Sequence, residues 1–597
     1  MSDVFVHDFP YGANLQADGR TKFRLWAPAQ ETVSVALENG PILPMARTSD
    51  GWFEAVAVCG DGSRYRYRLA DGTLVPDPAS RFQPDDVHGP SAVIDPCAYR
   101  WRNGEWTGRP WHEAVLYELH VGVLGGFRGV AKLLPGLAAL GITAVELMPI
   151  NDFPGRRNWG YDGVLPYAPD SAYGTPDELK ALVDAAHGLG LMIFLDVVYN
   201  HFGPDGNYLS LYAPQFFRDD HHTPWGPAID FRKAEVRAFF TENVLYWLVE
   251  YRFDGLRFDA VHAIEEQDWV DEMAATVRTT VEPERHVHLV LEHHNDASHL
   301  AKEVDAQWND DGHNVLHVLL TDEDGGYYAD YADKPAEKLA RCLADGFIFQ
   351  GEYSDYLGAP RGMPSGHLPP TAFVLFLQNH DQIGNRAFGE RLTTLADPAA
   401  LEAAIALVML CPQIPLLFMG EETASRTPFL FFTEHGPELA DAVREGRRNE
   451  FARFAAFSDP AKRTHIPDPN AARTFEASVA HGDLTLGAKR EALYRQLIDL
   501  RRTEIVPRLN ATRSVEARAI GQKAVVARWQ LGDGAMLTLA TNLDAQPIPI
   551  APPAGSLLFA NVVDAISLAR SGWLPGHCTY VFLDTGGVHP AGGVHHE

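Results

Sequence analysis

Three short segments of this chain carry residues that could do chemistry. In each, an apolar run of the kind that forms a buried strand leads into a carboxylic acid, and these acids are Asp259, Glu292 and Asp381. Three strands that end in acids predict a cleft in which carboxyl groups lie close together. Hydrolysis of a glycosidic bond needs such a pair, with one carboxyl ionised and the other protonated. The segments therefore indicate the chemistry of a glycosidase.

Two of the acids have neighbours that would tune their ionisation. Arg257 precedes Asp259 by two residues, so on a strand both side chains leave the same face. The guanidinium would lower the pKa of Asp259 and keep it ionised as a nucleophile. Glu292 would have its pKa raised if it faced Asp259, which suits a general acid. Each pattern has a structural alternative: a salt bridge in the core for Arg257 and Asp259, and a solvent-exposed strand end for Glu292.

The segment around Asp381 is the most specific of the three. A cluster of polar side chains follows directly on the apolar run Phe373–Leu377, and it comprises Gln378, Asn379, His380, Asp381, Gln382 and Asn385. Such polarity at the end of a barrel strand is costly to bury without a partner. Because sugar hydroxyl groups are suitable partners, the cluster favours a sugar-binding site over a purely structural network.

Two further segments could contribute to the same site. Asp196–His201 again runs from a buried strand into polar residues, and His201 could donate to a sugar hydroxyl group. Trp159 and Tyr161 follow the second predicted strand, where an aromatic ring can stack on the C–H face of a sugar. Taken singly, a histidine is more often structural and such an aromatic pair more often packs in the core. No His-Glu-x-x-His spacing is present, so we expect no metal, and the chemistry requires no cofactor.

Composition and charge narrow the class of protein. The 597 residues are too many for one core, so about three domains are expected. The net charge of −29 argues against binding to nucleic acid or to an anionic membrane, whereas a neutral sugar is unaffected by it. Five scattered cysteines indicate free thiols in a reducing compartment. Because the residues after Met1 do not resemble a secretory signal, we expect a cytoplasmic protein, and we expect a monomer.

The patterns of polar and apolar residues divide the chain into three parts. Residues 1–97 alternate polar and apolar residues between Asp-Gly turns and predict an N-terminal β-sandwich. Residues 98–508 alternate strand-like and helix-like runs and predict the catalytic domain. Residues 509–597 return to β-like runs and predict an antiparallel β domain with a flexible tail from Gly586.

The central part predicts an α/β fold, a (β/α)₈ TIM barrel, whose active site forms where the strands end. Its strand-like runs are Val115–His120, Ala144–Met148, Met192–Val197, Gly255–Asp259, Leu289–Glu292, Val304–Trp308, Phe373–Gln378 and Leu416–Met419. The most apolar stretch, Ala403–Gly420, is interrupted by prolines and predicts a buried helix and strand, not a membrane span. An open doubly wound sheet is the alternative, but neither a Gly-x-Gly-x-x-Gly motif nor a P-loop supports it.

Taken together and in order, four segments resemble the signature regions of the α-amylase family of glycoside hydrolases. They are Asp196–His201, Gly255–Asp259, Glu292 and Asn379–Asp381. The flanking β regions fit the family's N-terminal carbohydrate-binding-like module and its C-terminal β domain. The resemblance implies retaining hydrolysis with Asp259 as nucleophile, Glu292 as acid/base and Asp381 as stabiliser of the transition state. The residues that it implies around the sugar at the cleavage point are Tyr161, His201, Arg257 and His380, and Trp159 is a further candidate for substrate binding.

Finer features resemble one subfamily, whose members hydrolyse maltooligosyltrehalose. These features are Gln307–Asn314, Leu377–Arg391, Phe418–Glu422, Val443–Arg448 and Ile466–Pro469. The resemblance implies cleavage of the α-1,4 bond next to the terminal trehalose, release of trehalose, and maltooligosyltrehalose synthase as functional partner. It suggests further substrate-binding residues, namely Asp310, Asp311, His313, Gln382, Arg386 and Glu390.

Two alternatives stay open, and one residue pair departs from the subfamily pattern. The chain could be a glucan branching or debranching enzyme of the same family, or a glucan-binding protein without activity. The departure is His293–His294, which follows Glu292 where the subfamily resemblance leads us to expect more acidic residues.

Overall fold

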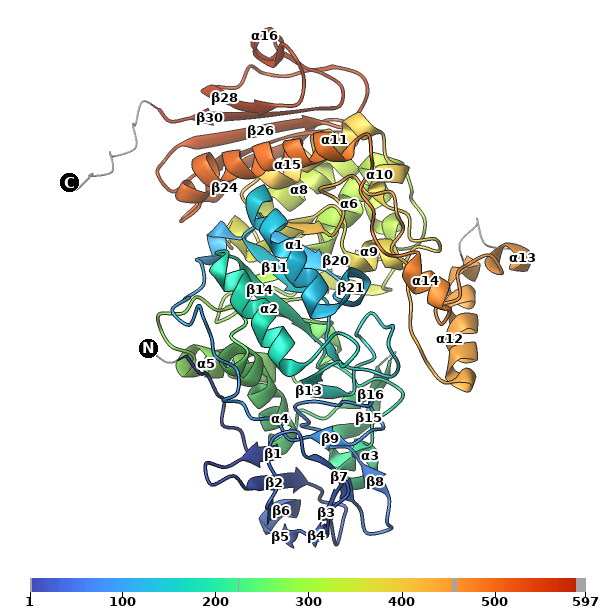
Figure 1. Cartoon of the computed structure of the whole chain (residues 1–597). Coiled ribbons are helices and arrows are strands. Elements are labelled where there is room, and N and C mark those ends of the chain that lie inside the picture. The colour runs from blue at the N-terminus through green and yellow to red at the C-terminus, as the bar shows by residue number, and fades with distance from the viewer. Residues whose placement is uncertain (1–2, 224, 454–458, 587–597) are drawn as a thin grey trace, which may run out of the picture.

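The computed structural model describes residues 3–223, 225–453 and 459–586. Figure 1 shows a central barrel with one group of β-sheets at the N-terminal end of the molecule and another at the C-terminal end. Most of the predicted flexible tail lies outside the described residues. The fold class predicted from the sequence, a TIM barrel between two β regions, is confirmed.

Eight parallel strands close the barrel, and the last of them pairs with the first. They are β10 (Leu116–Leu119), β11 (Ala144–Leu147), β14 (Met192–Val197), β17 (Gly255–Phe258), β18 (His288–Leu291), β19 (Ala306–Trp308), β22 (Phe373–Phe376) and β23 (Ile414–Phe418). Every residue of these strands is buried, as expected for a parallel sheet covered on both faces. All eight predicted strands are confirmed, and the site residues stand at the ends of adjacent ones.

Helices surround the barrel and connect its strands. The longer ones are α1 (Gly126–Leu140), α2 (Pro176–Gly188), α4 (Ala234–Leu245), α5 (Asp268–Thr280), α6 (Asp310–Thr321), α8 (Pro335–Asp345), α11 (Pro398–Leu410) and α15 (Gly487–Leu500). Thr175 and Glu178 form a capping box that fixes the start of α2, because each side chain accepts from the other's backbone N–H. The stretch Ala403–Gly420 forms most of α11 and all of β23, as predicted. Among the described residues, no helix has the length and apolarity to span a membrane.

After three of the barrel strands, the connection to the next barrel element contains additional short strands or helices. After β14 comes the hairpin β15 (Phe217–Thr223) and β16 (Gly226–Ile229), and after β19 comes the hairpin β20 (Gln350–Ser354) and β21 (Ala359–Gly362). After β23 the chain forms α12 (Pro437–Glu450), α13 (Pro460–Arg463) and α14 (Ala472–Glu476), which stand to one side of the barrel (Figure 1). Excursions that follow strands start from the C-terminal face, where a barrel builds its active site.

The N-terminal region is a β-sandwich of two sheets, ordered β1-β2-β6-β5 and β4-β3-β7-β8. Its strands are β1 (Gly12–Leu15), β2 (Thr21–Trp26), β3 (Ser34–Leu37), β4 (Ile42–Pro44), β5 (Ala46–Arg47), β6 (Trp52–Ala57), β7 (Arg64–Arg68) and β8 (Leu74–Val75). Arg81, in the connection to the barrel, places its Nη1 2.9 and 2.8 Å from the two carboxylate oxygens of Glu250. Lys180 adds a second cation 3.3 Å from Glu250, and all three side chains are buried.

The C-terminal region is a five-stranded antiparallel sheet in the order β24-β25-β26-β30-β28. The strands are β24 (Arg513–Gly521), β25 (Ala524–Gln530), β26 (Met536–Asn542), β28 (Ser556–Ala560) and β30 (Cys578–Asp584). This sheet packs on α8 and α11 of the barrel. Two side chains tie it there: Trp529 donates to the carbonyl of Leu343, and Thr579 donates to that of Ala403.

Arg81→Met should destabilise the protein strongly, because buried Glu250 loses both hydrogen bonds from Arg81 and keeps Lys180, 3.3 Å away, as its remaining cation. Breaking a buried ion pair on one side costs about 3–5 kcal/mol, whereas an exposed pair contributes about 0–1 kcal/mol. The matched control is Arg64→Met, since Arg64 pairs with Asp85 at the surface. Urea unfolding of both variants is the measurement, and equal midpoints would show that the buried pair does not stabilise the protein.

Candidate active site

Arg257 lies at the centre of the site and binds three carboxylates. Its Nη1 donates to Asp196 at 2.6 Å and to Asp259 at 2.9 Å, and its Nη2 donates to Glu292 at 2.7 Å. These residues come from β14, from the end of β17 and from the end of β18, which are neighbours in the barrel. Two of the three acids predicted for catalysis are therefore brought to one guanidinium, which itself is fully buried against the ring of Trp308.

Backbone and amide donors complete the coordination of the two acids. The N–H of Ala260 donates to Glu292 at 2.9 Å, and this residue adopts a left-handed backbone with φ of 40°. Such a conformation is strained for alanine and is a feature often found at functional sites. Asn200, at the end of the predicted Asp196–His201 segment, donates to the other oxygen of Asp259 at 2.9 Å. Each acid therefore accepts from Arg257 and from one further donor.

The ionisation of this pair differs from the sequence-based prediction. Burial and the negative charge of Glu292 raise the pKa of Asp259 well above its usual value, although Arg257 opposes the shift. Burial also raises the pKa of Glu292, but Arg257, His262 and the N–H of Ala260 outweigh it and lower this pKa to about 2. The sequence predicts the reverse. The surroundings of the pair favour protonation of Asp259 over protonation of Glu292.

Asp381 occupies the first turn of the short helix α9 (His380–Gly384), directly after β22. Asn379 caps this helix by accepting from the N–H of Gln382, which fixes the direction of His380 and Asp381. Asn385 donates to Asp381 at 2.9 Å, and the His380 ring lies 3.7 Å from the same carboxylate oxygen. Burial raises the pKa of Asp381, while His380 opposes that shift.

Tyr161, His201 and His380 form the wall beside these acids. The Tyr161 hydroxyl lies 2.6 Å from Asp196 and 2.8 Å from Nε2 of His380, and the His380 and Tyr161 rings are stacked. His201 approaches the backbone carbonyl of Tyr161 at 3.0 Å. Trp159 is buried behind this wall, where its indole N–H donates to the carbonyl of Leu430. The structure therefore groups four of the five predicted sugar-lining residues around Asp196 and places Trp159 beneath them.

A hollow of about 190 Å³ opens next to Glu292 and Asp381. The residues that line it are Glu292, His293, His294, Asp310, Asn314, Tyr327, Asp330, Tyr331, Tyr356, Leu357, Arg361, Asp381, Gln382 and Asn385. Gln382 donates to Asp310 at 3.3 Å, and burial together with the charge of Glu292 raises the pKa of Asp310 to about 7. The unexpected His294 stacks on His262, with ring centroids 3.6 Å apart. Polar and aromatic walls of this kind suit a sugar.

Of the six substrate-binding residues suggested by the subfamily resemblance, Asp310 and Gln382 line this hollow and the other four do not. Asp311 is buried and accepts from Asn295, Tyr331 and two backbone N–H groups of the 348–349 segment. His313 is buried against the carbonyl of Leu377, at the end of β22. Arg386 pairs with Glu323 at 2.7 Å and with Glu390 at 3.2 Å. These side chains position the segments that form the hollow, and no contact shown by the structure directs them into it.

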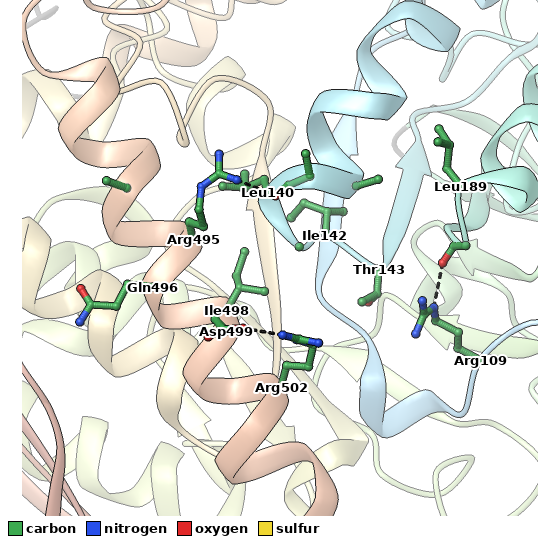
Figure 2. A pocket seen from close by; sticks show the side chains of 15 residues that line it. Arg109, Leu140, Ile142, Thr143, Leu189, Arg495, Gln496, Ile498, Asp499 and Arg502 are labelled. Carbon is green, nitrogen blue, oxygen red and sulfur yellow. Dashed lines mark hydrogen bonds and ion pairs between the residues drawn. The ribbon is translucent and has the colours of Figure 1, made fainter.

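A second, larger hollow of about 650 Å³ lies at the other end of the barrel (Figure 2). Its residues precede strands instead of following them: Arg109 lies before β10, Thr143 before β11 and Gly190 before β14. Arg109 donates to the carbonyl of Gly190 at 2.8 Å, and Arg502 pairs with Asp499 at 2.5 Å. Because the N-terminal face of a barrel contributes to stability and its C-terminal face to catalysis, the smaller hollow is the candidate active site.

Several residues of the site were not predicted from the sequence. Glu118 on β10, Trp308 on β19 and the backbone of Ala260 contact the predicted residues but carry no local motif of their own. Arg361 and Tyr331 reach the hollow from the excursion after β19, where spacing gives no guide to position. Within the described residues, no cluster of three or more His, Cys, Asp or Glu side chains could hold a metal ion.

Comparison with family models finds carbohydrate-active domains in the N-terminal and central parts of the chain. Residues 80–211 match the α-amylase catalytic domain, and residues 10–98 match carbohydrate-binding module 48, the isoamylase N-terminal domain. Residues 512–578 match a domain of unknown function. Together with the closed barrel and its gathered acids, these matches define a glycoside hydrolase of the α-amylase class.

Relatives narrow the class further. The chain is 42% identical over 501 residues to malto-oligosyltrehalose trehalohydrolase from Deinococcus radiodurans, covering 81% of this chain and 82% of the relative. It is 42% identical to the enzyme of the same name from Saccharolobus solfataricus, covering 74% and 80%. The solved structure of a putative alpha amylase from Salmonella typhimurium superposes with a TM-score of 0.90 at 44% identity, covering 96% of this chain and 99% of that one. The chain belongs to the malto-oligosyltrehalose trehalohydrolase family.

Glu292→Gln should lower the pKa of Asp259, because it removes the negative charge that helps to keep Asp259 protonated. The carboxylic-acid infrared band lost in Asp259→Asn should therefore disappear at a lower pH in Glu292→Gln than in the wild type. Glu323→Gln is the control, since Glu323 pairs with His317 and Arg386 away from the two acids. An unchanged titration of the band in Glu292→Gln would contradict the shared-proton assignment.

Proposed function

We propose that this protein hydrolyses the α-1,4-glucosidic bond next to the terminal trehalose of maltooligosyltrehalose and releases trehalose. The observation that carries the proposal is the single guanidinium of Arg257, which holds Asp259 and Glu292 through its two terminal nitrogens. A retaining glycosidase needs two carboxyl groups about 5–5.5 Å apart. Two carboxylates on one guanidinium suit that separation, and the trehalohydrolase relatives favour this substrate over other glucans.

In the proposed mechanism Asp259 attacks the anomeric carbon while Glu292 gives its proton to the leaving oxygen. The glycosidic C–O bond breaks, trehalose leaves, and a glycosyl ester forms on Asp259. Glu292, now ionised, removes a proton from water, which attacks the same carbon and frees Asp259. Asp381 would bind ring hydroxyl groups and hold negative charge near the oxocarbenium-like centre.

The first step requires a protonated Glu292, whereas the surroundings of the pair favour its ionised form. A glycosidic oxygen beside Glu292 can only accept a hydrogen bond, so it would favour the protonated form of that carboxyl group. Arg257 already donates to Asp259 at 2.9 Å, which favours the ionised form of Asp259 once Glu292 carries the proton. We propose that the bound sugar thereby transfers the shared proton to Glu292, which prepares both acids for the first step.

The proposal extends to the organisation and setting of the protein. We assign residues 1–97 to a carbohydrate-binding-like β-sandwich, residues 98–508 to the catalytic barrel and residues 509–597 to the C-terminal β domain. The five cysteines are free, which suits a reducing compartment such as the cytoplasm. We propose a monomeric enzyme of trehalose biosynthesis whose substrate comes from a maltooligosyltrehalose synthase, the reaction that must create the terminal trehalose unit.

The decisive assay compares maltooligosyltrehalose with the maltooligosaccharide of equal length, measuring trehalose and new reducing ends. Rapid release of trehalose with little cleavage of the plain oligosaccharide supports the proposal. Equal cleavage of both would indicate a general α-1,4-glucanase and overturn the substrate assignment. Inactivity on both, with activity on an α-1,6-branched glucan, would favour the branching or debranching alternative.

Asp259→Asn should lower kcat on maltooligosyltrehalose by roughly 10⁴-fold or more, because no glycosyl ester can form efficiently. Glu292→Gln should lower it by roughly 10²–10⁴-fold, the contribution of a general acid. Calorimetric binding of the substrate should persist in Asp259→Asn. The matched control is Asp499→Asn, an exposed carboxylate at the opposite end of the barrel, which should keep wild-type kcat. An active Asp259→Asn enzyme would refute the nucleophile assignment.

A further inference from the structure

Glu118 is a buried carboxylate on the floor of the candidate site. It lies on β10 and is 1% exposed. One of its oxygens accepts from the backbone N–H of His380 at 3.0 Å, and the other is in close contact with Nδ1 of the same histidine. One carboxylate thus binds both the backbone N–H and Nδ1 of His380. The other ring nitrogen, Nε2, faces Tyr161.

The contacts beyond His380 determine where its protons lie. Oδ2 of Asp196 accepts from Arg257 at 2.6 Å and lies 2.6 Å from the Tyr161 hydroxyl. Since Oδ2 already accepts from a cation, the Tyr161 hydroxyl must donate to it. The Tyr161 oxygen can then only accept from Nε2 of His380, 2.8 Å away. Nε2 therefore carries a proton, and Nδ1 carries another towards Glu118, so His380 is an imidazolium.

We propose that Glu118 is a positioning residue for the glycoside hydrolysis proposed above: it holds His380 as a cation whose charge faces Asp381. Only the catalytic role of this cation rests on the proposed function; the protonation of His380 by itself does not depend on it. A positive ring 3.7 Å from Asp381 favours the ionised form of this carboxyl, which burial otherwise disfavours. An ionised Asp381 is what stabilisation of an oxocarbenium-like centre requires.

Electrostatics of the surroundings agree with this geometry. Burial alone would lower the pKa of His380, but the charge and hydrogen bond of Glu118 outweigh it and raise this pKa to about 9. The other titratable groups near His380 are His120 after β10, Glu146 on β11, Tyr161 between β12 and β13, Asp196 on β14, Arg257 on β17, Glu292 after β18, and Asp381 beside it.

Glu146 provides a matched control on the adjacent strand. It is the register partner of Glu118 in the β10–β11 pair and is equally buried. Neither of its carboxyl oxygens has a hydrogen-bond partner among the described residues. Burial and the charges of Glu118 and Asp196 raise its pKa well above the usual value, which favours the neutral carboxyl group. Glutamine therefore imitates Glu146 but removes the charge of Glu118.

The test is Glu118→Gln with two readouts, beside Glu146→Gln and Glu118→Asp. First, the imidazole of His380, assigned in NMR spectra by comparison with His380→Asn, should titrate near pH 9 in the wild type. In Glu118→Gln burial dominates, so it should titrate below its usual pKa of about 6.5. Second, the alkaline limb of the kcat/KM profile on maltooligosyltrehalose should move in the same direction. Glu146→Gln should leave both unchanged, and Glu118→Asp, which keeps the charge, should restore both largely.

The outcomes separate this inference from the proposed function. If His380 titrates identically in the wild type and in Glu118→Gln, the inference is wrong whatever the substrate. If Glu118→Gln lowers kcat/KM equally at every pH with His380 unchanged, Glu118 has only a structural role. If Glu118→Gln does not fold, the titration of His380 in the wild type and in Glu118→Asp decides. A wild-type pKa of His380 below neutrality would also overturn the inference. A wild type that shows the NMR shift but releases no trehalose would refute the substrate assignment alone.

Discussion

The ion cluster around Arg257 is the interaction on which the site depends. Three carboxylates meet one guanidinium in a place where every partner is largely removed from solvent. Carboxylates so close together cannot all be ionised in a low-dielectric setting without a cation between them. Arg257 suits this position better than lysine would, since its planar fork presents separate nitrogens to separate acids. The catalytic pair is therefore held together by a residue that need not react.

The barrel backbone places this guanidinium with little freedom. Asp196 and Arg257 are register partners in the β14–β17 pair, so their side chains lie side by side on the inner face. Gly255 begins β17, and a Cβ there would lie 2.1 Å from the ring of Phe194, so only glycine lets the two strands pair at this level. Beyond β17 the left-handed turn at Ala260 aims a backbone N–H at Glu292. Strand register, a glycine and one strained residue thus fix the acids before any substrate arrives.

Much of the fold could be predicted from the sequence because its signals are local. Buried parallel strands appear as continuous apolar runs, and each of the eight was found, even the short β19, since the barrel requires one strand between Glu292 and Phe373. Acids that end such runs must meet at the same face, so the meeting of Asp259 and Glu292 followed from topology. What could not be predicted depends on three-dimensional detail. Asp311, His313 and Arg386 lie in the expected segments, yet their side chains point to scaffold partners, and a segment carries no signal for side-chain direction.

The ionisation of Asp259 and Glu292 is a second property that could not be predicted from the sequence. Sequence proximity placed Arg257 beside Asp259 and suggested that Asp259 would be the ionised member. The fold gives the same guanidinium to Glu292 as well, and Arg257, His262 and the Ala260 N–H lower the pKa of that acid, whereas burial and the charge of Glu292 raise the pKa of Asp259. Two carboxyl groups that share one cation and one proton are nearly balanced, and a change in the hydrogen bonds of either moves the proton. A glycosidic oxygen that accepts a hydrogen bond from protonated Glu292 would supply that change, because it stabilises only the protonated form of this acid.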